Sequence, residues 1–389
     1  FKGQQTKEQR QENFEKLKNG AKVILANPEV LQSEKLLEEI AKFNIKHIAI
    51  DEAHCVSEWG DTFRPAYTTV GNIIKKLGNP VVTAFTATAS PTVLERISQI
   101  MFDGNAHILR SESDRPNIIY HVVKTATKEK TALKYAELSE KPLIVFCATR
   151  KRAENLSKTF AEYFGYDKVK FYHAGLEKSE KDKIEKWFYP KTDAILCSTC
   201  AFGMGVDKKD IRTVIHLDPP PTAESYIQEA GRGGRDGKIS NAILLWSYEN
   251  KFDSLKFSEN SRERVLHNFA ETTDCRRQIL LDALGGEKTV CSGCDNCNGS
   301  SIHYANDEKI ALKFIKRFNK NFSVDELETE LQALFNKINF ENNKLRFWEF
   351  SDMRQIINSL LKQEKIINWT WSTSRNSSSC SSSYNLYFQ

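Results

Sequence analysis

The sequence predicts an α/β protein with two parallel-sheet lobes, then a helical region with clustered cysteines, then a helical module that ends in a hairpin. Short apolar runs alternate with helical segments up to about residue 255, four cysteines crowd into residues 275–297, and helical periodicity returns beyond residue 303. Apolar β-branched runs separated by helices are typical of parallel sheets that helices cover on both faces. At 389 residues the chain is too long for one core, so we expect two to four domains.

Residues 1–117 form the predicted first lobe and residues 118–255 the second, with a seam near residues 113–123. In the first lobe, apolar runs predict strands at 21–26, 45–50 and 80–88. In the second lobe, they predict strands at 142–150, 169–174, 193–199, 211–218 and 241–248.

Residues 256–301 hold the cysteine cluster, in which gaps of fifteen, two and two residues separate Cys275, Cys291, Cys294 and Cys297. Four thiolates close a tetrahedral shell, which is the arrangement of structural rather than catalytic zinc. Disulfide pairing is the alternative, and it fits a reduced compartment poorly. We therefore expect this region to bind a structural Zn²⁺ ion.

Residues 302–389 form the last predicted domain. Apolar residues recur at helical spacing in 307–318 and 352–364, and Ser323 with Glu326 predicts a helix cap. Residues 366–389 predict two strands around a serine-rich hairpin, although the final "NLYFQ" also resembles part of a protease-tag scar. Helices followed by a hairpin resemble a winged-helix module.

The composition is that of an ordinary soluble protein, with 40% hydrophobic and 28% charged residues. A net charge of +5 permits a polyanionic partner without requiring one. No apolar stretch approaches the roughly 20 residues that cross a bilayer, so we expect no membrane association. We predict an intracellular protein, in the cytoplasm or nucleoid of a bacterium or the nucleus of a eukaryote.

Two adjacent carboxylates, Asp51 and Glu52, follow the predicted strand at 45–50. Burying such a pair is costly unless a cation or a reacting group meets it. One carboxylate suffices to hold Mg²⁺ beside a nucleotide, and its neighbour then orients or deprotonates the attacking water. An acidic turn on the surface is the alternative interpretation.

The letters "DEAH" followed by "CVSEWGDTFRPAY" (51–67) resemble motif II and the aromatic-rich loop of the RecQ family of DNA helicases. The resemblance implies that Trp59, Phe63 and Arg64 contact single-stranded DNA and couple that contact to ATP hydrolysis. Aromatic rings offer any base a stacking face, worth about 1–3 kcal/mol each. The alternative is that Trp59 and Phe63 belong to the core. The family uses the position of His54 to link the nucleotide site to the DNA-sensing parts.

Three further segments resemble motifs III, V and VI of the family, namely "FTATAS" (85–90), residues 198–216 and residues 225–237. Thr86 and Thr88 of motif III are expected to report the nucleotide state. Motif VI carries Gln228, Arg232 and Arg235 in the pattern Q-x-x-G-R-x-G-R. Arginine forks bind phosphoryl oxygens, and we expect Arg235 to act as the arginine finger with the support of Arg232.

Glycines 231, 233 and 234 of motif VI permit a tight backbone. Many family members carry alanine where this chain has Gly233, and we expect this departure only to add flexibility.

Residues 144–154 resemble motif IV, and residues 172–175 resemble the segment that follows it. Thr149 and Arg150 follow one predicted strand, and Ser198 and Thr199 follow another, where open α/β sheets place ligands. We expect these residues to bind DNA phosphates without reading the base sequence. Each of them also suits a helix cap.

The resemblance covers residues 1 to about 300 with specific motifs and reaches residue 389 more loosely. It implies two RecA-like lobes, the first of them incomplete, a zinc-binding region and a winged helix. The implied activity is that of an ATP-dependent DNA helicase of recombination and repair, which moves 3′ to 5′ along one strand. Its partners would be ATP with Mg²⁺, single-stranded DNA and duplex junctions, and we expect a monomer.

The phosphate-binding pattern G-x-x-x-x-G-K-[ST] is absent from the sequence. Family members place it upstream of the point at which this chain begins, so we expect a piece of a longer or cleaved polypeptide that does not hydrolyse ATP by itself. An inactive DNA-binding protein is one alternative, although such a protein need not keep all the acidic and arginine residues named above. An RNA helicase of the wider superfamily is the other, and the aromatic-rich loop and the cysteine cluster disfavour it.

Overall fold

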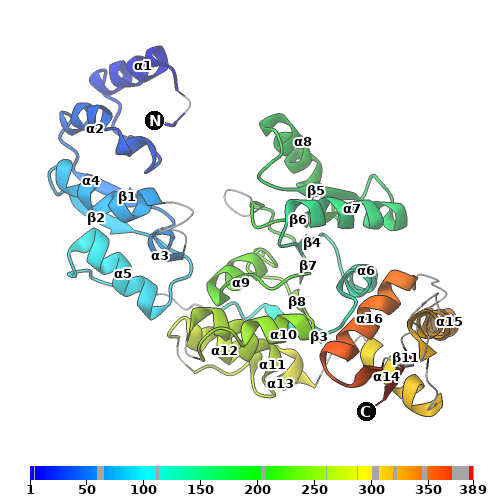
Figure 1. Ribbon diagram of the computed structural model, residues 1–389. Helices are drawn as coiled ribbons and strands as arrows, with labels where there is room; N and C mark the ends of the chain where they lie inside the picture. The colour runs from blue at the N-terminus through cyan, green and yellow to red at the C-terminus, as the bar shows by residue number, and fades with distance from the viewer. Residues whose placement is uncertain are drawn as a thin grey trace, which may run out of the picture. The chain divides into compact units, whose positions relative to one another are not determined.

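The computed structural model describes residues 1–3, 5–58, 65–110, 114–202, 207–259, 261–286, 288–299, 306–318, 322–343, 348–369 and 385–388 (Figure 1). The chain divides into two compact units. The first contains Phe1–Asp114 with Leu281–Glu287, and the second contains Arg115–Leu280 with Lys288–Gln389. The division after Asp114 lies at the predicted seam, whereas the finer division into four domains stays a prediction. None of the described helices is long and apolar enough to cross a membrane.

The first unit is built around two parallel strands, β1 (His47–Ile50) and β2 (Val81–Ala84), in a register that pairs His47 with Val81. Its helices are α1 (Lys7–Lys18), α2 (Glu34–Ala41), α3 (Cys55–Glu58), α4 (Val70–Lys76) and α5 (Pro91–Phe102), with short 3₁₀ turns at Val30–Gln32 and Pro65–Thr69. Ile50, Val56, Val70 and Val93 are members of the buried cluster between the strands and helices.

The predicted strand at 21–26 is wrong, because the structure has no strand there. Val23 and Leu25 are 75% and 80% exposed. An extended segment becomes a strand only when it pairs with a neighbour, and an apolar run does not supply that neighbour.

The second unit contains a six-stranded sheet in the order β3-β8-β7-β4-β6-β5, in which every pairing is parallel. The strands are β3 (Ile118–Lys124), β4 (Leu143–Phe146), β5 (Val169–Tyr172), β6 (Ile195–Ser198), β7 (Thr213–His216) and β8 (Ser240–Trp246). The predicted parallel sheet and its five predicted strands are confirmed. Strand β3 overlaps the segment at 113–123, which the sequence marked only as a seam.

Helices cover both faces of this sheet, as predicted. On β4, Leu143 and Val145 face one buried cluster, whereas Ile144 and Phe146 face another. The helices from Lys128 to Asn298 are α6 (Lys128–Leu138), α7 (Arg150–Phe164), α8 (Lys178–Phe188), α9 (Ala223–Ala230), α10 (Tyr248–Ser254), α11 (Val265–Glu271), α12 (Arg276–Ala283) and α13 (Asp295–Asn298), with a 3₁₀ turn at Arg262–Arg264; the last three residues of α12 belong to the first unit. The alternation follows from the two-residue period of a strand.

The C-terminal part of the second unit combines α14 (Asp307–Phe318), α15 (Val324–Asn343) and α16 (Phe350–Lys362) with an antiparallel sheet. The sheet has the order β10-β11-β9 and contains β9 (Phe322–Ser323), β10 (Ile366–Trp369) and β11 (Asn385–Phe388). Ser323 caps α15 as predicted, because its hydroxyl accepts from the amide of Glu326 at 3.2 Å. The "NLYF" residues form β11, so they contribute to the fold. Residues 370–384, which carry the predicted serine-rich hairpin, lie outside the described residues.

One buried carboxylate joins α14 to the segment after β3. Asp307 is 2% exposed, and its Oδ2 accepts from the hydroxyl of Thr125 at 2.8 Å and from the amide of Ala126 at 2.9 Å. The same oxygen accepts from the amide and the hydroxyl of Thr127, at 3.1 and 3.0 Å. Asp307 therefore docks the C-terminal helices onto the six-stranded sheet.

Replacing Asp307 by Ala should lower the free energy of unfolding by about 3 kcal/mol, because buried donors then lose their acceptor. Urea unfolding should show this loss, whereas Asp325→Ala, at a side chain that is 93% exposed, should unfold like the wild type. Equal midpoints for the two variants would show that Asp307 does not stabilise this docking.

Candidate nucleotide, DNA and metal sites

Asp51 lies directly after β1, at the carboxyl end of the two-stranded sheet, where its carboxylate is exposed. The backbone turns sharply here, because Glu52 adopts the left-handed conformation with φ at 51°. Two hydrogen bonds fix the turn: the amide of Phe85 donates to the carbonyl of Ile50 at 2.8 Å, and the amide of Ala53 donates to the carbonyl of Phe85 at 2.9 Å. Strain of this kind in a residue other than glycine is often found at functional sites.

His54 connects motif II to motif III. It is 4% exposed, and its Nδ1 lies 3.3 Å from Oε2 of Glu52 and 3.1 Å from Oγ1 of Thr86. The hydroxyl of Thr86 donates to the carbonyl of Thr88 at 3.0 Å, so it can only accept from His54. Nδ1 therefore carries the proton, and the imidazole joins Glu52 to the motif III segment.

Residues 59–64 of the aromatic-rich loop lie outside the described residues, so the roles of Trp59, Phe63 and Arg64 stay predictions. Its described end contains Tyr67, a buried residue whose hydroxyl donates to the carbonyl of Asp51 at 3.4 Å. Sequence reasoning missed this contact, although Tyr67 is the last residue of the quoted motif.

Motif VI lies on α9 and the loop after it. Gln228 and Arg232 are partly buried, and Arg235 is exposed. Nη1 of Arg235 lies 3.0 Å from Oδ1 of Asp207, which belongs to the motif V segment. The structure thus brings motifs V and VI together, and Arg235 remains accessible.

Packing explains two glycines of motif VI. A Cβ at Gly233 would lie 2.1 Å from Oγ of Ser240, and a Cβ at Gly234 would lie 2.4 Å from the carbonyl oxygen of Lys238. Gly234 also has φ at 57°. The expectation that Gly233 only adds flexibility is therefore wrong, because this residue is buried and leaves space for Ser240.

The four predicted DNA-binding residues of the second unit differ in exposure. Thr149 caps α7 by accepting from the amide of Arg152 at 3.2 Å, and Arg150 is exposed. The structure disagrees with the prediction for Ser198, because this residue is 0% exposed and its hydroxyl lies 2.8 Å from the carbonyl oxygens of both Tyr172 and Thr199. The side chain of Thr199 is 9% exposed.

Sequence reasoning missed Asp218, which follows β7 and holds the start of α7. Its Oδ1 lies 2.6 Å from Nη1 of Arg152 and 3.5 Å from Nζ of Lys128, and its Oδ2 accepts from the amide of Ala148 at 3.2 Å. Burial lowers the pKa of Lys128 to about 8, although the negative charge of Asp218 raises it. The sequence did contain a signal for Asp218, namely an acidic residue at the end of an apolar strand.

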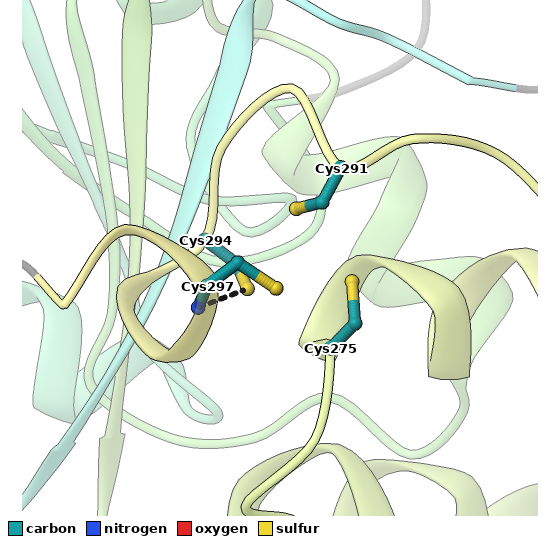
Figure 2. A group of neighbouring side chains, drawn as sticks. All are labelled: Cys275, Cys291, Cys294 and Cys297. Atoms are coloured by element: carbon teal, nitrogen blue, oxygen red, sulfur yellow. Dashed lines mark hydrogen bonds between the residues drawn. The ribbon is translucent and has the colours of Figure 1, made fainter.

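The four clustered cysteines lie in the second unit and point toward a common centre (Figure 2). Their sulfur atoms all lie within 4.8 Å of one another. Cys275 precedes α12, and Cys294 caps α13, where its Sγ accepts from the amide of Cys297 at 3.4 Å. Burial raises the pKa of Cys294, but hydrogen bonds from the Cys297 and Arg276 amides bring it below its usual value. Four close sulfurs fit tetrahedral Zn²⁺.

The cysteine loop also covers the exposed edge of β3. The amide of Tyr120 donates to the carbonyl of Gly293 at 3.4 Å, and the amide of Val122 donates to Oδ2 of Asp295 at 2.9 Å. Asp295 forms a buried ion pair with Arg276. An open strand edge is prone to pairing with other chains, so the loop protects this edge of the sheet.

Family models match three parts of the chain. A DEAD/DEAH box helicase model matches residues 2–97, a helicase conserved C-terminal domain matches 127–237, and a RecQ zinc-binding model matches 250–298. The last match contains all four cysteines.

Curated relatives bear names of the same kind. The chain is 42% identical over 227 residues to the probable ATP-dependent DNA helicase RecS of Bacillus subtilis, a match to 58% of this chain and 46% of that protein. It is 30% identical over 359 residues to RecQ of the same organism, over 88% of this chain and 59% of that protein. It is 31% identical to the RecQ-like DNA helicase BLM of Xenopus laevis, over 76% of this chain and 24% of that protein. The chain thus spans about half the length of its bacterial relatives.

Solved structures share the fold at low identity. The Mss116 helicase bound to single-stranded RNA and AMP-PNP has a TM-score of 0.55 at 16% identity, over 92% of this chain and 68% of that one. The helicase MrfA bound to DNA and AMPPNP has a TM-score of 0.53 at 17% identity, over 100% of this chain and 48% of that one.

Replacing Cys294 by Ser should remove zinc and destabilise the second unit together, because metal binding contributes on the order of 10–16 kcal/mol in such sites. Metal content and thermal unfolding should be measured on the same sample. Cys200→Ser, at an exposed cysteine outside the cluster, is the matched control. A metal-free Cys294→Ser protein that unfolds like this control would contradict a structural zinc site.

Proposed function

Because this chain belongs to the RecQ family of DNA helicases, we propose that it couples ATP hydrolysis to movement along single-stranded DNA and to duplex unwinding, in a polypeptide that also carries the phosphate-binding loop. The observation that carries the proposal is the arrangement around β1. Asp51 is exposed at the carboxyl end of the sheet, and His54 joins Glu52 to Thr86. This edge is where open α/β sheets bind their ligands.

In this proposal Asp51 would hold Mg²⁺ beside ATP, where the ion would supply positive charge against the phosphates. Glu52 orients or deprotonates the attacking water. His54 supports this role, because its Nδ1 proton lies between the Glu52 carboxylate and the Thr86 hydroxyl. A change in the position of Glu52 is thereby passed to motif III, which follows β2.

The second unit supplies the positive charge. Arg235 stabilises the charge that develops on the phosphoryl group, and Arg232 and Gln228 contribute from the same motif. The accessibility of Arg235 supports this role, because its side chain is 31% exposed and its guanidinium forms an ion pair with Asp207, an exposed residue. An ion pair between exposed groups is weak and is readily exchanged for a phosphate.

Thr149 and Arg150 bind DNA phosphates at the carboxyl edge of the six-stranded sheet, and the aromatic-rich loop contributes Trp59, Phe63 and Arg64. Movement is 3′ to 5′, and the C-terminal helices and sheet act as a winged helix that engages duplex junctions in recombination and repair. The zinc site maintains structure only. An inactive DNA-binding protein is less well supported, because the chain keeps Asp51, Glu52, Gln228, Arg232 and Arg235 together.

In the full-length protein, Glu52→Gln should lower kcat for ATP hydrolysis by about 10²- to 10⁴-fold, because an amide cannot act as the general base. Nucleotide binding should persist, because the glutamine side chain has nearly the same size and shape as glutamate. Glu95→Gln, at an exposed acid on α5, is the control. Turnover and fluorescent nucleotide binding should be measured with single-stranded DNA and, separately, with RNA. Unchanged turnover in Glu52→Gln would remove its catalytic role, and stronger stimulation by RNA would favour an RNA helicase.

Replacing Arg235 by Ala should lower kcat by about 10³-fold or more, because the developing phosphoryl charge loses its partner. Asp207→Ala is the informative control, since it breaks the ion pair but leaves the guanidinium in place. We expect Asp207→Ala to hydrolyse ATP at a rate within a few-fold of the wild type. Equal losses in both variants would show that Arg235 only holds the motif V segment.

A further inference from the structure

The loop that carries Arg232 and Arg235 is held by a third arginine. Nη1 of Arg115 donates to the carbonyl of Gly231 at 3.4 Å, and its Nη2 donates to the carbonyls of Gly233 and Gly234, both at 3.2 Å. These carbonyls lie on both sides of Arg232 and directly before Arg235. The guanidinium thus fixes the peptide groups that set the direction of both side chains.

Other contacts hold the same loop at its end. Nδ2 of Asn117 donates to the carbonyls of Gly234 and Lys238, at 2.7 and 2.8 Å, and the amide of Gly234 donates to the carbonyl of Ile211 at 2.8 Å. Arg115 and Asn117 both precede β3, in the segment that the sequence marked as a seam. This short segment therefore forms hydrogen bonds with motif VI, which lies more than a hundred residues later in the sequence.

Arg115 is itself held from the cysteine region. Arg277, which is 1% exposed, donates through Nη1 to the carbonyl of Arg115 at 3.0 Å. Its Nη2 donates to the carbonyl of Gly293 at 3.1 Å and to that of Ile118. Gly293 lies between Cys291 and Cys294, so one buried guanidinium joins the cysteine loop to the backbone of Arg115.

A second route runs through aromatic rings. The guanidinium of Arg277 lies 5.1 Å from the centre of the Tyr120 ring, and that ring lies 6.2 Å from the ring of Tyr226. Tyr226 is a wholly buried residue of α9, the helix that carries Gln228. Arg115 therefore contacts the loop of motif VI directly, and Arg277 is linked to the helix of the motif through the ring of Tyr120.

We propose that Arg115 and Arg277 are positioning residues for phosphoryl transfer: they hold the motif VI loop so that Arg232 and Arg235 point in the productive direction. The proposal rests on the function proposed above. Neither residue needs to touch ATP or DNA. A small displacement of a reacting group lowers catalysis far more than binding, so the effect of losing Arg115 should appear in kcat.

The test uses Arg115→Lys in the full-length protein, with Arg277→Lys as a second variant. Lysine keeps the charge but lacks the fork that reaches three carbonyls. We expect kcat to fall about 10- to 100-fold, with KM for ATP, DNA affinity and zinc content within about twofold of the wild type. Amide hydrogen exchange of residues 231–237 should become faster in both variants.

The matched control is Arg264→Ala, which removes an arginine of the same unit that donates to the carbonyl of Ser254 at 3.0 Å, outside motif VI. It should match the wild type in every measurement. Unchanged kcat and unchanged exchange in Arg115→Lys would overturn the proposal, and so would a joint loss of zinc, DNA affinity and ATP affinity, which indicates general unfolding. If the wild type itself lacks DNA-stimulated ATP hydrolysis, the proposed function fails, while the exchange measurement still decides whether Arg115 holds the loop.

Discussion

The parallel pairing of short strands positions the candidate functional groups in each of the two units. Because β1 and β2 run in the same direction with Ile50 opposite Ala84, the segments that follow them emerge at the same edge of their sheet. His54, three residues after Asp51, therefore contacts both Glu52 and Thr86. In the six-stranded sheet the same constraint brings Asp218, after β7, to the start of α7, after β4.

The six-stranded sheet also depends on how its edge is closed. Three backbone groups on the outer edge of β3 form hydrogen bonds here. The carbonyl of Ile118 accepts from Arg277, and the amides of Tyr120 and Val122 donate to the cysteine loop. The loop has few apolar residues of its own, so four sulfur ligands are a physically reasonable way to order it. Through Arg277, the cysteine loop thereby contacts the segment from which Arg115 reaches motif VI.

Local patterns predicted much of this arrangement. Apolar runs located β1, β2 and five strands of the larger sheet, and cysteine spacing located the sulfur cluster. The strand at 21–26 failed because strand formation needs a partner that composition does not reveal. Ser198 was predicted to bind DNA because it lies at the end of a strand. Its side chain points into the protein instead, because successive side chains of a strand alternate between the two faces of the sheet. Arg115 and Arg277 were missed because their partners are backbone carbonyls, which leave no pattern in a sequence.

We propose that Glu52 and Arg235 act in the same step of ATP hydrolysis in the full-length protein. The most direct test is a double-mutant cycle of Glu52→Gln and Arg235→Ala, measured as kcat with saturating ATP and single-stranded DNA. Groups that act as a unit give strongly non-additive losses. If both residues serve one step, kcat of the double variant should be hardly lower than kcat of the slower single variant. Losses that multiply would show that the two residues act independently and would contradict it.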